Sequence, residues 1–173
     1  MKFFFLSLFC ILLSFINPIK SENKIAFVDM DRIISTSNPG LSVLKQLKVI
    51  NNKNLTFLNK EENRFKEKET KLISQKNIIS EKDFRNKVDN LKLEIKNYKK
   101  SRTKMITEFN KIKVNNTNKL LKLINPILIK FSNEKEISVI LQKKNLVIGK
   151  TELDITDEII KIINSEIEEF KIK

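Results

Sequence analysis

The residue types that perform most enzyme chemistry are scarce in this chain. Its 173 residues include no His, no Trp and a single Cys, at position 10. An imidazole base and a Cys/His metal site are therefore excluded, and two glycines are too few for a glycine-rich phosphate loop. Lysines and carboxylates are abundant, but nothing in the sequence places two of them in a pocket. We predict no catalytic residues, no metal site, no cofactor and no enzyme activity, which leaves non-covalent binding.

The positive charge is concentrated in one part of the chain. Residues 41–125 contain 22 Lys and Arg against 9 Asp and Glu, whereas residues 22–40 and 126–173 together contain 10 against 12. One interpretation is a solvated helix face in a chain biased toward Lys, Asn and Ile. The other is an electrostatic surface for anionic partners, namely acidic chains, anionic lipid or nucleic acid.

The same part of the chain carries a repeat typical of a coiled coil. Residues 41–125 contain no Gly and no Pro, and they lie between Gly40 and Pro126. Apolar residues recur there with alternating steps of three and four, first up to Ile79 and again from Phe84 onward. An amphipathic helix lying on a membrane is the alternative, but its apolar stripe should be wider.

The repeat breaks once, near the middle, where the step is five residues. Ser80 is a good N-cap, and Asp83 resembles the acidic partner of a capping box. If the chain reverses there, facing residues have numbers that sum to about 163. This rule pairs Phe65 with Tyr98 and Glu62 with Arg102. We predict an antiparallel hairpin over residues 41–133 with its tip at 79–83.

The flanking segments predict a small β-rich body, residues 22–40 and 134–173. We expect strands at 24–30, 137–141 and 145–149, the last two joined by Lys143 and Lys144, and a C-terminal helix capped by Asp154 or Thr156. The fold class is α+β, with a long antiparallel coiled-coil hairpin inserted in the body. Three short strands cannot form a full core in one copy, so we expect oligomerisation. Its candidate residues are Ile25, Phe27, Val28, Val139, Leu141, Leu146 and Ile148.

The sequence also predicts how the two helices of the hairpin begin and end, and what the first residues of the chain do. Pro126 predicts a kink in a helix that ends near Asn133, and Asn38 and Pro39 suit a helix start. Residues 1–21 have the charged, apolar and cleavage regions of a secretory signal peptide. Cleavage after Ser21 removes Cys10 and sends the mature chain out of the cytoplasm.

Three segments resemble the Skp/OmpH family of periplasmic chaperones for outer-membrane proteins. KIAFVDMDRIISTSNPG (24–40) resembles its opening strand, short helix and turn, and LINPILIKFSNEKEISVIL (123–141) its kinked helix and following strand. LDITDEIIKIIN (153–164) resembles its closing segment and is the most specific match. Glu136 stands where the family often has glycine, so we expect Asn133 to take the left-handed turn conformation. The tail after Asn164 is longer than usual.

The resemblance implies a homotrimer whose β-rich body carries three helical tentacles around a cavity. The cavity would hold unfolded outer-membrane proteins (the clients) in the periplasm without ATP, preventing their aggregation during outer-membrane protein assembly. Lipopolysaccharide or anionic-lipid contact is left open, with no residues assigned. A cationic cage attracts acidic clients at long range, and exposed apolar side chains add weak contacts. The candidate client-binding residues are Phe57, Ile73, Ile78, Lys82, Arg85, Lys87, Leu93, Lys96, Lys100 and Ile106.

Other functions compatible with the sequence give different expectations. A structural or adaptor coiled coil of the cell envelope would not suppress aggregation of many unfolded proteins. A histone-like nucleic-acid binder fits the high lysine content, but the predicted export argues against a nucleic-acid partner. A binder of anionic membranes would depend steeply on salt. For the apolar candidates, simple cover of the coiled coil is an equal alternative.

Overall fold

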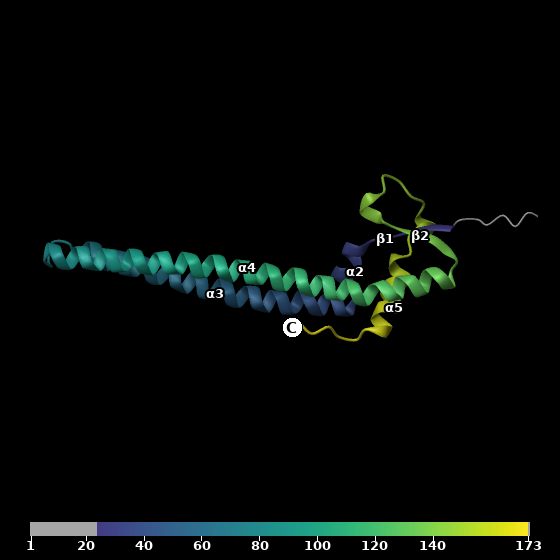
Figure 1. Cartoon of the computed structure of the whole chain (residues 1–173), viewed down its shortest axis with the longest axis horizontal. Helices are drawn as coiled ribbons and strands as arrows, with labels where there is room; N and C mark the ends of the chain where they lie inside the picture. Colours follow the sequence, from purple (N-terminus) through teal and green to yellow (C-terminus); the bar gives the residue numbers. More distant parts are fainter. Residues whose placement is uncertain (1–23, 173) are drawn as a thin grey trace, which may run out of the picture.

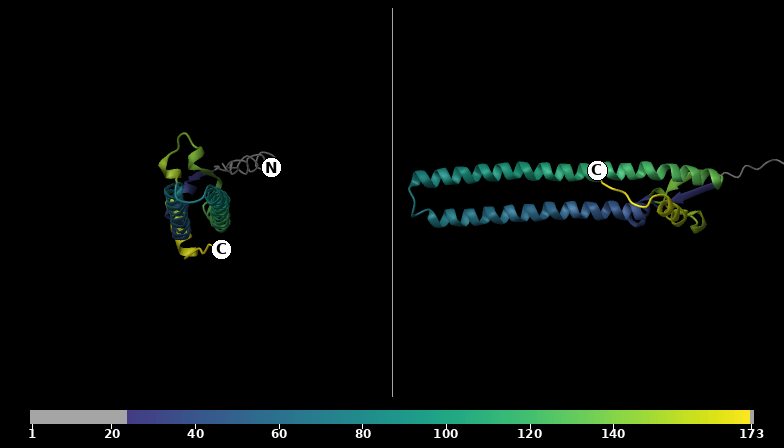
Figure 2. Two further views of the ribbon diagram at one scale, coloured as in Figure 1. Left: turned by 90° about the vertical axis from the view of Figure 1, so that its left-hand side faces the viewer. Right: turned by 90° about the horizontal axis from the view of Figure 1, so that it is seen from below.

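A computed structural model describes residues 24–172 of the chain (Figure 1). The predicted signal peptide, residues 1–21, lies outside these residues. Two long helices run side by side away from a small body at one end (Figures 1 and 2). They are α3 (Asn38–Gln75) and α4 (Glu81–Glu134), with 38 and 54 residues. The predicted class, a mostly helical chain with a coiled-coil hairpin and a small sheet, is confirmed.

The chain reverses at residues 76–80, slightly before the predicted tip at 79–83. Ser80 is the N-cap of α4, and its hydroxyl oxygen accepts a hydrogen bond from the backbone N–H of Asp83 (3.1 Å). Glu81 and Asp83 lie in the first turn, where acidic side chains suit the positive end of the helix dipole. No residue of the turn has a positive φ angle, so a sequence without glycine can form it.

At the opposite end of α3, the N-cap is Ser37 rather than the predicted Asn38. The Ser37 hydroxyl accepts from the backbone N–H of Gly40 (3.3 Å), and Pro39 lies in the first turn as predicted. The backbone N–H of Asn38 instead donates to the side-chain carbonyl of Asn164 (2.7 Å), which ties α3 to the C-terminal helix.

Halfway along the hairpin, the predicted aromatic contact is present and the predicted ion pair is not. The rings of Phe65 and Tyr98 lie 5.3 Å apart between centroids. The Tyr98 hydroxyl donates to a Glu62 carboxylate oxygen (2.9 Å). Within residues 24–172, no ion pair joins Glu62 to Arg102, which is exposed. Tyr98 takes the position facing Glu62 that the prediction assigned to Arg102.

Near the body, the buried positions depart from the predicted repeat. Leu44 on α3 and Leu123 on α4 were predicted at the seam but are exposed, whereas Val43, Leu120 and Ile124 are buried. Here the helices also pack against the body, and the buried residues of α4 from Asn116 to Phe131 recur in steps of four, four, three and four, which is longer on average than the 3.5-residue repeat of a coiled coil.

The body consists of a two-stranded sheet and two short helices. Strand β1 (Lys24–Val28) pairs in parallel with β2 (Ile137–Gln142). Helices α2 (Met30–Thr36) and α5 (Thr156–Glu166) cover the base of the hairpin, with the 3₁₀ turns η1 (Lys143–Asn145) and η2 (Thr151–Leu153) between β2 and α5. The core lies where these elements meet, and its largest fully buried side chains include Ile33, Leu120, Ile124, Ile159 and Ile163.

The predicted third strand, residues 145–149, is wrong. A tight two-residue hairpin requires left-handed backbone conformations, which favour Asn-Gly or similar pairs. Lys143 and Lys144 do not suit them and form η1 instead. This 3₁₀ turn directs the chain away from β2, and Ile148 remains 91% exposed.

The left-handed residue after α4 is Glu136, not the predicted Asn133. Its φ is +55°, the single positive φ among non-glycine residues in the described part of the chain. A side chain in this conformation costs roughly 1 kcal/mol. The Glu136 carboxylate forms an exposed ion pair with Lys24 (3.2 Å), which offsets part of that cost at most.

Glu136→Gly should therefore stabilise the protein by about 0.5–1 kcal/mol, because glycine adopts a positive φ without steric cost. The free energy of unfolding from urea titration measures this change. Glu136→Ala is the matched control: it removes the same ion pair but keeps a Cβ, so no gain is expected. A glycine variant no more stable than the alanine variant would contradict the explanation.

Candidate functional site

All ten predicted client-binding residues have exposed side chains. Ile78 lies in the turn and is 80% exposed, and the other apolar candidates lie along α3 and α4 outside the seam. Arg85 forms an ion pair with Glu81 within the first turn of α4. The hairpin thus presents every one of these side chains to solvent, although exposure alone does not assign them a ligand.

The ten residues do not share one face of the hairpin. Phe57 and Lys87 border two neighbouring hollows, and Glu94 lines both of them. Phe57 and Lys87 therefore lie on the same flank of the hairpin. Ile73 and Lys96 each follow a seam residue and lie on the opposite flank by helical spacing. Arg85 and Ile106 follow seam residues in the same way. Leu93 and Lys100 lie on the outer side of α4. The surface is therefore distributed around the hairpin rather than concentrated in a pocket.

The flank that carries Phe57 and Lys87 contains a chain of ion pairs across the two helices. Glu94 on α4 accepts from Lys68 (2.6 Å) and from Arg64 (3.1 Å) on α3. Arg64 also contacts Glu61 (2.7 Å) and lies over the ring of Phe65, 4.6 Å from its centroid. Closer to the tip, Lys87 donates to the side-chain oxygen of Gln75 (2.9 Å). These contacts join the helices where few apolar side chains do.

The ion pairs change the acid–base behaviour of this flank. The hydrogen bond from Lys68 lowers the pKa of Glu94, and this outweighs the opposing effect of desolvation. The hydrogen bond to Glu61 raises the already high pKa of the Arg64 guanidinium. On the seam beside them, desolvation and then the bond to Glu62 raise the pKa of Tyr98. For Glu94 and Arg64 the direction of the shift favours the charged form, which strengthens the ion pairs across the hairpin, and for Tyr98 it favours the neutral phenol.

The body carries the seven candidate oligomerisation residues. Some of their side chains are buried and others are exposed. Ile25, Val139 and Leu141 are exposed (49%, 46% and 39%). Ile25 pairs with Val139, and Phe27 pairs with Leu141, so the four side chains share one face of the sheet. Phe27 is buried, with the Lys143 ammonium 5.8 Å from its ring centroid.

The remaining oligomerisation candidates, Val28, Leu146 and Ile148, lie off the exposed face of the sheet. Val28 is buried on the core side of the sheet, so it is unavailable to a partner. Leu146 is half-buried and Ile148 is exposed, both in the segment that was predicted to be a strand.

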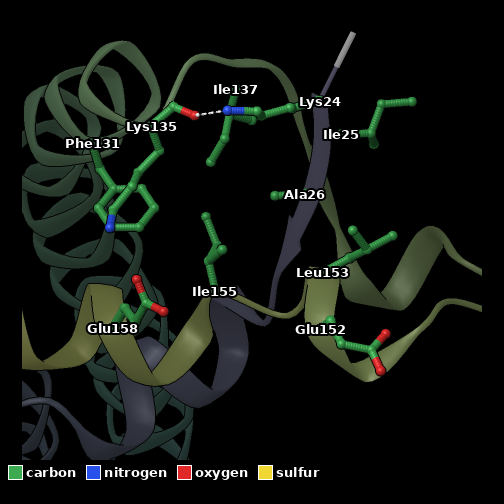
Figure 3. A pocket seen from close by; sticks show the side chains of 10 residues that line it. All are labelled: Lys24, Ile25, Ala26, Phe131, Lys135, Ile137, Glu152, Leu153, Ile155 and Glu158. Carbon is green, nitrogen blue, oxygen red and sulfur yellow. Dashed lines mark hydrogen bonds between the residues drawn. The ribbon is translucent and has the colours of Figure 1, made fainter. Parts of the chain in front are cut away.

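A hollow of about 530 Å³ opens between β1, the end of α4, η2 and α5 (Figure 3). Ala26, Phe131, Ile137 and Ile155 provide apolar walls, and the Lys24 ammonium donates to the backbone carbonyl of Lys135 (3.3 Å) at the rim. Two lysines and two glutamates balance the charge of the lining. The hollow suits an apolar side chain better than a charged ligand.

Two further kinds of feature, a metal-binding cluster and a membrane-spanning helix, are absent from residues 24–172. Residues 24–172 contain no group of three or more His, Cys, Asp or Glu arranged to hold a metal ion. None of the helices described is long and apolar enough to span a membrane.

The cross-helix ion pairs were missed from the sequence, although a signal existed. The sum rule that paired Phe65 with Tyr98 also places Lys68 opposite Glu94 and Gln75 opposite Lys87. The predicted pairs were all at seam positions. Lys68, Glu94, Gln75 and Lys87 lie beside the seam, where long polar side chains reach across to the other helix.

Comparison with known proteins gives a family match and a structural match. Residues 24–163 match the model of the family described as "Outer membrane protein (OmpH-like)". A crystal structure from Caulobacter crescentus CB15, assigned provisionally as an OmpH-like outer membrane chaperone, has a TM-score of 0.77 and 16% sequence identity. The match covers 85% of this chain and 87% of that chain. No curated protein sequence matches this chain.

Acid should weaken the hairpin through Glu94. Because its pKa is lower in the folded state, Glu94 stabilises the fold above its unfolded pKa of about 4.3. This contribution is lost as the pH falls through the lower folded value. We expect Glu94→Gln to lower the midpoint of thermal unfolding at pH 7, and the difference from wild type to shrink as the pH falls below the unfolded pKa of about 4.3. Glu108→Gln, an exposed change on the same helix, is the control. A Glu94→Gln difference that is independent of pH would contradict the role of the ion pairs.

Proposed function

Because the chain belongs to the OmpH-like outer membrane protein family, we propose that it is a chaperone for outer-membrane proteins, acting as an ATP-independent holdase in the periplasm. The observation that supports this most directly is the hairpin itself. It projects from a small body, carries 22 Lys and Arg against 9 Asp and Glu between residues 41 and 125, and has exposed apolar side chains between the cations.

We propose that three copies assemble through the exposed face of the sheet. Ile25, Val139 and Leu141 form an apolar strip on a two-stranded sheet, which cannot cover both of its own faces. Val147 and Ile148 in the following loop are also exposed. Burial of this surface between copies would contribute roughly 25 cal/mol per Å² of apolar area. Three assembled bodies would leave three hairpins around a central space.

The hairpins would hold a client by many weak contacts. Long-range attraction brings an acidic unfolded chain to the cationic surface, and charge contacts tolerate sliding because they lack strict geometry. Apolar residues such as Phe57, Ile73 and Ile106 lie on different flanks, so they offer alternative contacts rather than one fixed site. Such a surface suits a client without structure and needs no nucleotide.

The proposal predicts a defined stoichiometry. In sedimentation velocity, the mature protein should behave as a trimer and take up one urea-unfolded outer-membrane barrel protein, whose aggregation it suppresses at near-equimolar trimer. A monomer indifferent to the unfolded barrel would contradict the proposal. A protein that assembles but does not suppress aggregation of several different barrels would instead be an adaptor of the cell envelope.

The charge of the hairpin should matter more than the net charge. Lys96→Glu/Lys100→Glu should weaken client binding by roughly tenfold or more at low salt, with a smaller effect at high salt. The matched control, Lys150→Glu/Lys161→Glu, changes the net charge equally at exposed sites of the body. Fluorescence anisotropy of a labelled client at 50 mM and 300 mM salt measures both variants. Equal weakening by the two variants would mean that the hairpin surface is not the contact.

A further inference from the structure

The C-terminal tail, residues 167–172, is an extended segment that lies along the base of the hairpin. It leaves α5 after Glu166 and turns back toward α3, as the yellow segment of Figure 1 shows. The family match ends at residue 163, so the tail lies outside the matched residues.

Two side chains of α3 hold the tail by its backbone. The Ser42 hydroxyl and the Gln46 side-chain N–H both donate to the carbonyl oxygen of Phe170 (2.9 and 2.6 Å). The backbone N–H of Ile172 donates to the Gln46 side-chain oxygen (3.0 Å). One amide group thus satisfies the C=O of one residue and the N–H of the second residue after it, as the edge of a neighbouring strand would.

The side chains of Ser42 and Gln46 are held in place by each other, and they bind backbone groups that every peptide has. Gln46 also donates to the hydroxyl and the backbone carbonyl of Ser42 (both 3.1 Å), which fixes the orientation of its amide. None of the three contacts to the tail involves a polar side chain of the tail. Any extended segment could make them if its side chains fit.

The side chains of the tail show what fits. Phe170 is 9% exposed and packs into the core, Ile172 packs partly against the same core, and Lys171 between them is exposed. An aromatic residue and an aliphatic residue separated by one polar residue is the pattern of a strand with one apolar face. Strands of outer-membrane barrels alternate in the same way.

We propose that Ser42, Gln46 and the part of the core that Phe170 packs against form a receptor for one extended strand with an alternating aromatic–polar–aliphatic pattern, and that the tail occupies it until a client strand displaces it. This rests on the proposed holdase function and adds to it one directional site at the base of the hairpin. The displaced tail carries Glu168 and Glu169, and the vacated site lies at the root of the cationic hairpin.

A peptide competition experiment tests the receptor in the full mature chain. The probe is a fluorescent synthetic peptide with the sequence of residues 166–172, EIEEFKI. Phe170→Ala should loosen the tail and expose the site. Because the tethered tail competes at a high effective concentration, the peptide should bind Phe170→Ala at least tenfold more tightly than wild type. Adding Gln46→Ala should abolish this binding, and a scrambled peptide should not bind.

Equal affinity for wild type and Phe170→Ala, or binding to neither, would mean that the tail merely completes the core and would overturn the proposal. Circular dichroism checks that both variants fold. If Phe170→Ala unfolds, hydrogen exchange of residues 167–172 in wild type replaces it: exchange should rise on addition of an unfolded barrel, and unchanged protection would overturn the proposal. Aggregation suppression in Lys96→Glu/Lys100→Glu tests the holdase function separately, because these residues lie far from the tail.

Discussion

The architecture depends on the reversal of the chain between Gln75 and Glu81. Ser80 ends the turn by capping α4, and Asp83 completes the cap within the first helical turn. Once the direction is reversed, each residue of α3 acquires a fixed partner on α4, and the two flanks of the hairpin are determined. The position of every exposed lysine and apolar side chain on the hairpin follows from this register.

A hairpin of two helices is only one layer thick, so it buries little apolar surface away from the body. The fully buried side chains gather at the base, where α2 and α5 add a second layer, whereas in the distal half Phe65 is the side chain that reaches burial. The cross-helix ion pairs around Glu94 and the contact between Phe65 and Tyr98 take over the role of a core there. Exposed ion pairs contribute modestly, so local stability should fall from the base toward the tip. A compliant tip and a firm base are compatible with the proposed holdase function.

The local signals in the sequence predicted the hairpin well. The cap at Ser80 followed from the chemistry of neighbouring residues, and the contact between Phe65 and Tyr98 followed from the repeat together with the position of the reversal. Features set by packing were missed. The buried positions shift near Leu120, where the body also packs against the hairpin, and residues 145–149 do not form a strand because Lys143 and Lys144 do not suit a tight hairpin turn. Glu136 adopts a left-handed conformation without glycine, and the docking of Phe170 depends on core contacts that form only on folding. For the candidate site, the exposure of the ten residues was predictable, but their distribution over several flanks required the actual register.

The most direct test of this account is the distance between the two helices of one hairpin. Spin labels on cysteines replacing Lys66 and Lys99, both exposed beside the aromatic contact, can be measured in assemblies diluted so that one subunit carries the labels. The account predicts a separation below about 20 Å, since helices in contact lie about 10 Å apart. A separation near 50 Å, the length of 33 residues of continuous helix at about 1.5 Å each, would mean an unbent rod and would contradict the account.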